Sequence, residues 1–227
     1  MRGFYVKGIT VLTITVFGFV SLGLTLDDRG EIEEVGEELA YLPSVEYLKP
    51  ALLGFEHLAA DLFWLQTVQY FGSHIQTDRR YPKLYQLVDL VTSLDPQFVD
   101  AFRFGGLFLT LGRQYPEAIA IYEKGIAEIP SRWELPYDLG RVYYLELHDY
   151  PKALYWWELA NRLPDRPHYL PRFIARLYAR TGHRETAIEL WIEMYRTADN
   201  VRIQEIILQE LEKLGVTVSR EGEAHRD

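Results

Sequence analysis

The sequence predicts an all-α protein in which an N-terminal transmembrane helix is followed by an α-solenoid of about four helix pairs and a C-terminal capping helix. Two observations support this prediction. An uncharged apolar run occupies residues 8–26, and tetrapeptides of similar sequence recur every 34 to 35 residues in the rest of the chain. Apolar and polar residues alternate over no useful length, so we also expect essentially no β-sheet.

Composition excludes several classes of protein. The chain has 227 residues, a formal net charge of −9, no cysteine and 48% hydrophobic residues. The missing cysteines exclude a disulfide scaffold and thiolate metal sites. The acidic charge disfavours nucleic acid as a partner, because a chain of this sign repels phosphate. The high apolar content argues against a disordered chain.

Residues 8–26 have the length and the flanks of a membrane anchor. At 1.5 Å per residue they would form a helix of roughly 28 Å, close to the ~30 Å hydrocarbon core of a bilayer. Arg2 and Lys7 precede the run, whereas residues 27–40 carry seven acidic residues and one arginine. The positive-inside rule then places the N-terminus in the cytoplasm and the solenoid in the periplasm. We therefore predict a single-pass inner-membrane protein that contacts the lipid bilayer through residues 8–26.

Two other interpretations of this run stay open. A cleaved signal peptide would have a shorter apolar region and a cleavage site between small residues, for which the best candidate is Ser21-Leu22-Gly23. A helix buried in the core of the protein is the third interpretation, although the run lacks a polar face.

The recurring tetrapeptides share a tyrosine and a proline, except for the last, which is degenerate. They are Tyr81-Pro82-Lys83-Leu84, Tyr115-Pro116-Glu117-Ala118, Tyr150-Pro151-Lys152-Ala153 and Arg184-Glu185-Thr186-Ala187. A second marker, the prolines Pro96, Pro130 and Pro164, recurs every 34 residues. Proline is tolerated in the first turn of a helix and disfavours helix in the residue before it. The second helix of each unit should therefore begin at the tetrapeptide and end before the later proline.

This period and pattern resemble the tetratricopeptide repeat (TPR) family, whose unit is two antiparallel helices in about 34 residues. Leu139-Gly140 followed by Tyr143 matches the first part of the family pattern. A small residue four positions before an aromatic one matches the second part in Ala118/Tyr122, Ala153/Trp157 and Ala187/Trp191. The resemblance covers about residues 54–196. The first unit departs from the pattern, because Leu84 replaces the small alanine.

The resemblance and the composition together suggest five segments. We expect a cytoplasmic stub and transmembrane anchor at 1–26, an acidic spacer and lead-in at 27–53, a TPR-like solenoid at 54–200, a capping helix at 201–215 and a flexible tail at 216–227. Gly215 is typical of a residue that ends a helix.

In the resembling family, the first helices of successive units line a groove that binds an extended peptide or a partner helix. With first-helix positions set near 65, 99, 133 and 168, basic and aromatic side chains fall on this groove. The candidate partner-binding residues are Arg103, Tyr137, Arg141, Tyr144, Tyr169, Arg172 and Arg176. Arginine and tyrosine are favoured at binding hot spots. In the alternative, these arginines pair with Asp100, Glu134 and Asp138 and bind nothing.

The first helix of the first unit, at roughly 54–75, has little polar surface. Phe63, Trp64 and Val68 are candidate docking residues for a membrane partner or a second copy of the chain, because terminal repeats of a solenoid normally carry a polar outer face. The first unit is also similar to a group of bacterial repeat proteins in three segments, 41–44, 48–50 and 58–72. That similarity implies a membrane-anchored bacterial TPR protein.

No motif points to catalysis. The sequence has no G-x-S-x-G, Walker A or G-x-G-x-x-G motif, and His57 with Asp61 lacks a second histidine at metal-binding spacing. We expect no enzyme activity, cofactor or metal. The leading hypothesis is a membrane-anchored scaffold that binds a protein partner, as an accessory subunit of a bacterial envelope complex in secretion, pilus or respiratory assembly. The alternative is a soluble periplasmic peptide-binding module released by signal-peptide cleavage.

Overall fold

The computed structural model describes residues 44–218 and 224–226. All of them belong to one compact unit, Leu42–Asp227. Ten α-helices, one short π-helix and two short strands make up this part of the chain. The prediction of a helical solenoid with a TPR-like arrangement is confirmed.

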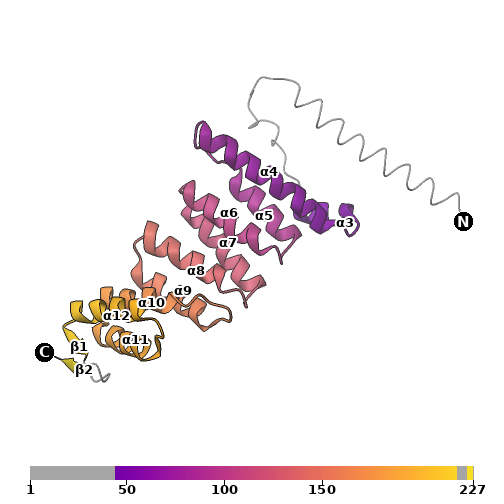
Figure 1. Ribbon diagram of the computed structural model, residues 1–227. Helices are drawn as coiled ribbons and strands as arrows, with labels where there is room; N and C mark the ends of the chain where they lie inside the picture. Colours follow the sequence, from indigo (N-terminus) through magenta and orange to yellow (C-terminus); the bar gives the residue numbers. More distant parts are fainter. Residues whose placement is uncertain (1–43, 219–223, 227) are drawn as a thin grey trace, which may run out of the picture. The chain divides into compact units, whose positions relative to one another are not determined.

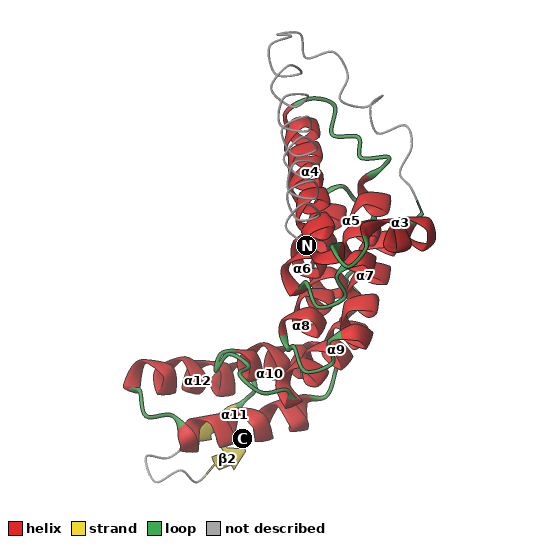
Figure 2. Cartoon of the chain, turned by 90° about the vertical axis from the view of Figure 1, so that its right-hand side faces the viewer, coloured by secondary structure: helices red, strands yellow, loops and turns green. Residues whose placement is uncertain are grey.

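The helices follow one another in pairs (Figure 1). A short lead-in helix, α3 (Val45–Leu52), comes first and packs against α4 and α5. The four pairs are α4 (Glu56–Gln76) with α5 (Leu84–Leu94), α6 (Val99–Leu111) with α7 (Tyr115–Glu128), α8 (Glu134–Arg141) with α9 (Tyr150–Arg162), and α10 (Leu170–Arg180) with α11 (Arg184–Thr197). Helix α12 (Val201–Lys213) packs on α11 at the end of the row (Figure 2).

The repeated sequence positions form the interior of each pair. Ala118, Ala153 and Ala187, the small residues of the repeat pattern, have no exposed surface. Their aromatic partners one turn later are at most 3% exposed. Small residues on one side of a helix pair let the backbones approach, and the large rings then fill the space to the neighbouring helix. The repeat pattern is thus a packing pattern.

Glycines mark the closest approaches between the two helices of a pair. A methyl group at Gly106 would lie 2.4 Å from Cζ of Tyr122, and one at Gly140 would lie 2.3 Å from Cδ1 of Trp157. Gly105 marks a similar approach between neighbouring pairs, because a methyl group there would lie 2.4 Å from Cγ1 of Val88 on α5. The absence of a side chain at Gly106 and Gly140 allows the rings of Tyr122 and Trp157 to lie against the backbone of the preceding helix.

Helix α8 continues into a π-helix, η1 (Val142–Glu146), in which the Leu147 amide donates to the Val142 carbonyl, five residues earlier, at 3.2 Å. The third repeat is one residue longer than its neighbours at this point. In the second and fourth units the second helix begins nine positions after the small residue of the first helix. In the third unit it begins ten positions after it, from Gly140 to Tyr150. A π-turn accommodates one additional residue within a helix, so η1 absorbs this insertion and the later repeats stay in phase.

The C-terminal end differs from the sequence expectation in one respect. Strand β1 (Val216–Val218) pairs antiparallel with β2 (Ala224–Arg226), with Val216 opposite Arg226, whereas we expected essentially no sheet. The β-branched sequence Val-Thr-Val has high strand propensity, but three residues are too few to produce a detectable alternation. Both strands fall within 216–227, which the sequence predicts as a flexible tail.

The predicted inner-membrane location is wrong for the residues that the structure describes. Within residues 44–218 and 224–226, no helix combines the length and the apolar character needed to cross a bilayer. The longest helix there, α4, has 21 residues but carries Glu56, Asp61 and several exposed glutamines. The predicted anchor at 8–26, its proposed lipid contact and the acidic segment 27–40 lie outside the described residues.

Candidate functional site

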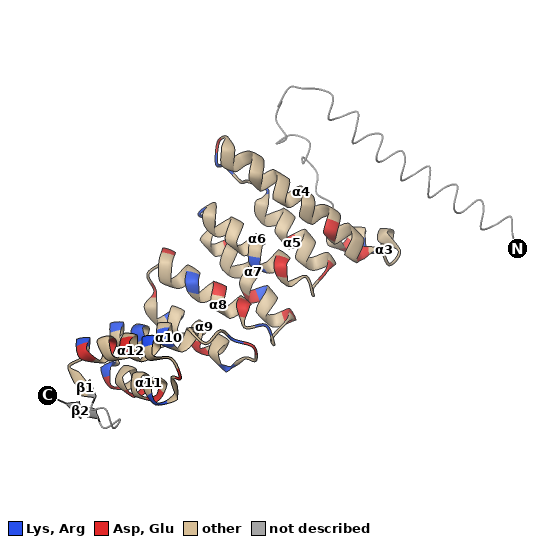
Figure 3. Cartoon of the chain, in the orientation of Figure 1, with Lys and Arg blue, Asp and Glu red and all other residues tan. Residues whose placement is uncertain are grey.

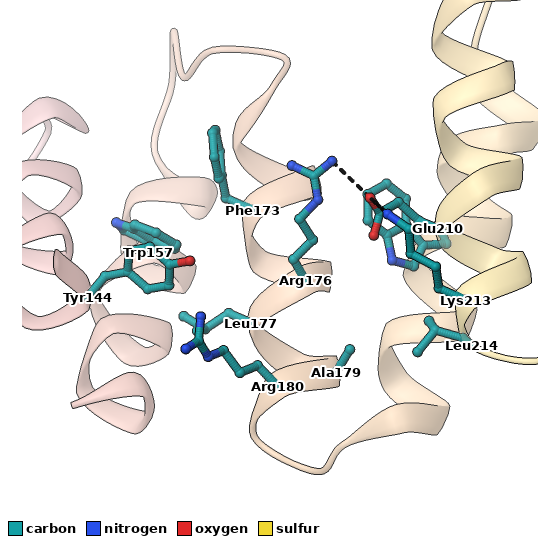
Figure 4. Close-up of a pocket in the computed structure, with 11 residues that line it drawn as sticks. Tyr144, Trp157, Phe173, Arg176, Leu177, Ala179, Arg180, Glu210, Lys213 and Leu214 are labelled. Carbon is teal, nitrogen blue, oxygen red and sulfur yellow. Dashed lines mark hydrogen bonds and ion pairs between the residues drawn. The ribbon is translucent and has the colours of Figure 1, made fainter. Parts of the chain in front are cut away.

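Five of the seven predicted partner-binding residues line two neighbouring pockets on the first-helix side of the last two pairs. One pocket, of about 410 Å³, is lined by Tyr137, Tyr169, Arg172, Phe173 and Arg176. The other, of about 440 Å³, lies between η1, α9, α10, α11 and α12 and also includes Phe173 and Arg176 (Figure 4). We call the surface formed by these two pockets the C-terminal groove. Figure 3 shows that charged residues are frequent on α10 and α12 and sparse along α4.

Aromatic side chains from three helices surround Trp157 at the base of the C-terminal groove. The Trp157 indole nitrogen donates to the carbonyl oxygen of Tyr137 at 3.1 Å. Tyr144, Tyr137 and Phe173 lie around the indole, with ring centroids 5.2, 6.2 and 5.8 Å away. Because the indole is held by both a hydrogen bond and its neighbours, it forms a fixed apolar floor.

Tyr137 and Tyr169 form the side of the groove nearest the start of α8. Their rings are 6.3 Å apart in an edge-to-face arrangement. Burial, together with the hydrogen bond to Tyr169, raises the pKa of Tyr137 to about 12. The Tyr137 hydroxyl is therefore a neutral hydrogen-bonding group at physiological pH.

The basic residues of α10 differ in how far they are engaged. The Arg176 guanidinium is 3.1 Å from Oε1 of Glu210 on α12, and Lys213 binds the same oxygen at 3.1 Å. Burial alone would raise the pKa of Glu210, but the hydrogen bonds from Lys213 and Arg176 outweigh it and lower the pKa. The guanidinium of Arg180 lies 4.2 Å from the centroid of the Tyr150 ring. No hydrogen bond or ion pair of the Arg172 side chain occurs within the described part of the chain.

Arg103 and Arg141 lie outside the two pockets of the groove. Arg103 Nε donates to the Asp138 carboxylate at 3.0 Å, and Arg141 approaches the same carboxylate at 3.5 Å. Asp138 is only 7% exposed. Burial raises its pKa, and the two guanidinium groups offset part of that effect. Arg103 therefore ties α6 to α8, one of the internal pairings that the sequence left open, while Arg141 lies in a smaller pocket of about 100 Å³. Their roles in binding stay predictions.

The three predicted docking residues of α4 lie on different sides of that helix. Trp64 stacks on Phe108 at 5.9 Å, and both Trp64 and Phe63 pack against the core of the first unit. Val68 is on the outer side and is 40% exposed. Leucines that the sequence analysis did not select are more exposed on this outer side, namely Leu58, Leu62 and Leu65 at 55 to 59%. The spacing of these leucines, three to four residues, was the sequence signal that could have identified this exposed side of α4.

Sequence reasoning also missed Glu210 and Phe173 as parts of the site. Glu210 lies 34 residues after Arg176, which is one repeat, so the periodicity could have indicated the pair. His57 contacts Asp95 at 3.0 Å rather than Asp61. Within the described residues no group of three or more histidines and carboxylates is placed to hold a metal ion.

No protein-family model and no curated protein matches the sequence. Several solved structures are similar to the chain. One is the Naa15/Naa10 complex bound to HypK-THB, with a TM-score of 0.46 and 16% identity over 66% of this chain and 24% of that chain. Another is YrrB, described as a TPR protein with an unusual peptide-binding site, with a TM-score of 0.45 and 18% identity over 79% of this chain and 88% of that chain.

A third is MamA from Desulfovibrio magneticus RS-1, with a TM-score of 0.42 and 19% identity over 69% of this chain and 96% of that chain. The chain spans about a quarter of the length of the Naa15 complex chain that it matches. The TPR-like fold rests on the chain's own four helix pairs and their period of 34 to 35 residues.

Proposed function

We propose that this protein is a binding scaffold that holds a segment of a partner protein in the C-terminal groove and has no catalytic centre of its own. The observation that carries the proposal is that the two pockets meet at Phe173 and Arg176. Their meeting gives a continuous surface of partly exposed aromatic and guanidinium groups. These residue types dominate binding energy in protein interfaces. Exposure of these rings to water is unfavourable, so their burial against a partner would contribute to binding.

The sequence allows two versions of this function, and the groove favours the peptide-binding module. A pocket volume of about 440 Å³ is in the usual range of ligand-binding clefts. A role as accessory subunit of a bacterial envelope complex is a narrower proposal, in which the same groove would hold a subunit of that complex. The identity of the proteins that co-purify with the chain separates the two versions.

The proposal is tested by co-purification with matched charge reversals. Arg172→Glu combined with Arg176→Glu reverses two charges in the groove, and we expect the partner to be lost. Arg196→Glu combined with Arg202→Glu makes the same change on exposed residues of α11 and α12 that line neither pocket, and we expect the partner to be retained. Circular dichroism confirms that both variants stay folded. Equal recovery of the same partners by both variants would contradict the proposal.

A further inference from the structure

Two acid–base contacts tie first helices of neighbouring repeats together, and each joins residues one repeat apart. Arg103 on α6 binds Asp138 on α8 at 3.0 Å, and Arg176 on α10 binds Glu210 on α12 at 3.1 Å. The sequence separations are 35 and 34 residues. In both contacts the carboxylate is the more covered partner, with 9% and 17% of its side chain exposed. A contact of this kind thus recurs along the first-helix side.

The contact is missing between α8 and α10. Arg141 on α8 is one repeat before Arg176, so the two equivalent positions carry like charges. Tyr137, one repeat before Arg172, is uncharged, and the neighbouring Asp138 is already bound by Arg103 and Arg141. In the described residues no ion pair joins α8 to α10 or α4 to α6, and the Arg172 guanidinium has no partner. Between α8 and α10 this lack of an ion pair coincides with the pocket of about 410 Å³.

The unused N–H donors of Arg172 and Arg176 match a carboxylate. A guanidinium group has five N–H donors and binds a carboxylate with two parallel hydrogen bonds. None of the Arg172 donors is used within the described chain, and Arg176 donates to Glu210 through Nη2 alone. The two arginines are one helical turn apart on α10, so they lie on the same side of that helix. Arg103, the equivalent of Arg172 two repeats earlier, is by contrast paired with the Asp138 carboxylate.

An apolar side chain fits beside the carboxylate. The pocket of about 440 Å³ shares Phe173 and Arg176 with the first one, and its floor is Trp157, Leu177 and Trp191, each at most 3% exposed. In Figure 4 Phe173 and Arg176 project from α10 at the entrance, and Trp157 lies across from them. A ligand that reaches both pockets must therefore present an acidic and a large apolar group close together.

Resting on the proposed function, we propose that the C-terminal groove recognises an extended peptide segment in which an aspartate or glutamate lies next to a leucine or phenylalanine. The acidic side chain lies in the pocket of about 410 Å³, where the chain itself supplies no carboxylate, and binds Arg172 and Arg176. The apolar side chain enters the pocket above Trp157. The partner is thus an acidic protein segment, although the chain itself carries a net charge of −9.

The test uses two fluorescein-labelled peptides and the full chain. One peptide has the sequence Gly-Ser-Asp-Leu-Glu-Phe-Asp-Ser-Gly, and the other has asparagine and glutamine in place of the acidic residues. By fluorescence anisotropy we expect the acidic peptide to bind at least about tenfold more tightly, because a hydrogen bond to a charged group has that effect on an equilibrium. The difference should decrease as salt is added.

Arg172→Gln should remove most of the preference for the acidic peptide, whereas Arg196→Gln on the exposed side of α11 should leave it unchanged. Equal binding of the acidic and amide peptides would overturn the carboxylate site while leaving the groove function standing. Absence of binding by both peptides would also overturn the inference. In that case, co-purification with the charge-reversed variants tests the proposed scaffold function separately.

Discussion

The first two repeats and the last two use aromatic residues in different ways. In the first repeats, Phe71 stacks almost parallel on Phe108, with ring centroids 4.2 Å apart and an angle of 9°. Trp64 also stacks on Phe108, with ring centroids 5.9 Å apart and an angle of 6°. In the last repeats, the rings around Trp157 lie at 22 to 58° to the indole. Phe71 is 7% exposed, whereas Tyr169 and Phe173 in the last repeats are 37% and 38% exposed and line a pocket. One repeat pattern can thus build either a closed interior or a binding groove.

Truncating one ring in each region should show this difference most strongly. Phe71→Ala removes a ring that is 7% exposed, so we expect the free energy of unfolding to fall by about 3–5 kcal/mol. Tyr169→Ala removes a ring that is 37% exposed and one hydrogen bond to Tyr137, so we expect a loss of about 1 kcal/mol or less. Urea unfolding followed by circular dichroism measures both values. Similar losses for the two variants would mean that Tyr169 belongs to the core rather than to a groove.

A glycine-to-alanine pair should distinguish the interior of a helix pair in the last repeats from the outer side of α4 in the first, with a smaller effect. At Gly140 the new methyl group would lie 2.3 Å from Cδ1 of Trp157, and we expect the overpacking to cost about 1–3 kcal/mol. At Gly72 on α4 nothing lies within 4 Å of the added methyl, so the higher helix propensity of alanine should stabilise the protein by roughly 0.5–1 kcal/mol. Thermal unfolding distinguishes opposite shifts in Tm. A destabilised Gly72→Ala variant would show that the outer side of α4 is covered.

The fold was predictable because one sequence feature repeats. The tetrapeptides begin α7 and α9 at Tyr115 and Tyr150, as their prolines indicate, and the degenerate tetrapeptide begins α11 at Arg184. In the first unit α5 begins only at Leu84, the last residue of its tetrapeptide. The π-helix was not predicted, although its signal is present as one additional residue between Gly140 and Tyr150. A difference of one residue in the spacing tells where an insertion lies but not whether a loop or a helix absorbs it.

The residue types also did not predict the backbone conformation at most of the turns. Arg79, Arg113 and His148 have φ values of 54 to 59°, and Gly182 has 87° at the equivalent turn. These residues are spaced by 34 to 35 positions, each just before a second helix. Only the last is glycine, the residue that adopts this conformation without steric cost. Residue type therefore identified one of four turns, and the period was the better guide.

The site was predictable in part. Tyr137, Tyr144, Tyr169, Arg172 and Arg176 line the C-terminal groove, because the helical period places them on one side. The partner of each arginine could not be read from the sequence. Arg103 and Arg172 occupy equivalent positions two repeats apart, but Asp138 binds Arg103 together with Arg141 on its own helix. Which arginine is left free depends on distances of a few ångströms between helices, and these follow from packing rather than from spacing.

Acidification should destabilise the C-terminal end of the solenoid through protonation of Glu210. Hydrogen bonds from Lys213 and Arg176 hold its pKa below the ordinary value of 4.5 despite burial. The ionised form is thus favoured in the folded state, so Glu210 contributes stability above pH about 4.5 and loses it as the pH falls through the folded pKa. At pH 7, Glu210→Gln should lower the free energy of unfolding by up to about 1 kcal/mol. The difference from the unmodified protein should shrink steadily below pH 4.5.

Glu205→Gln is the matched control, because Glu205 is on the exposed side of the same helix. Urea unfolding between pH 7 and 3.5 measures all three proteins. If Glu210→Gln stays less stable than the unmodified protein at pH 3.5 by the same amount as at pH 7, the ion pair with Arg176 is not its cause. Arg176 would in that case be as available to a ligand as Arg172, and the last two repeats would differ from the first two in packing alone.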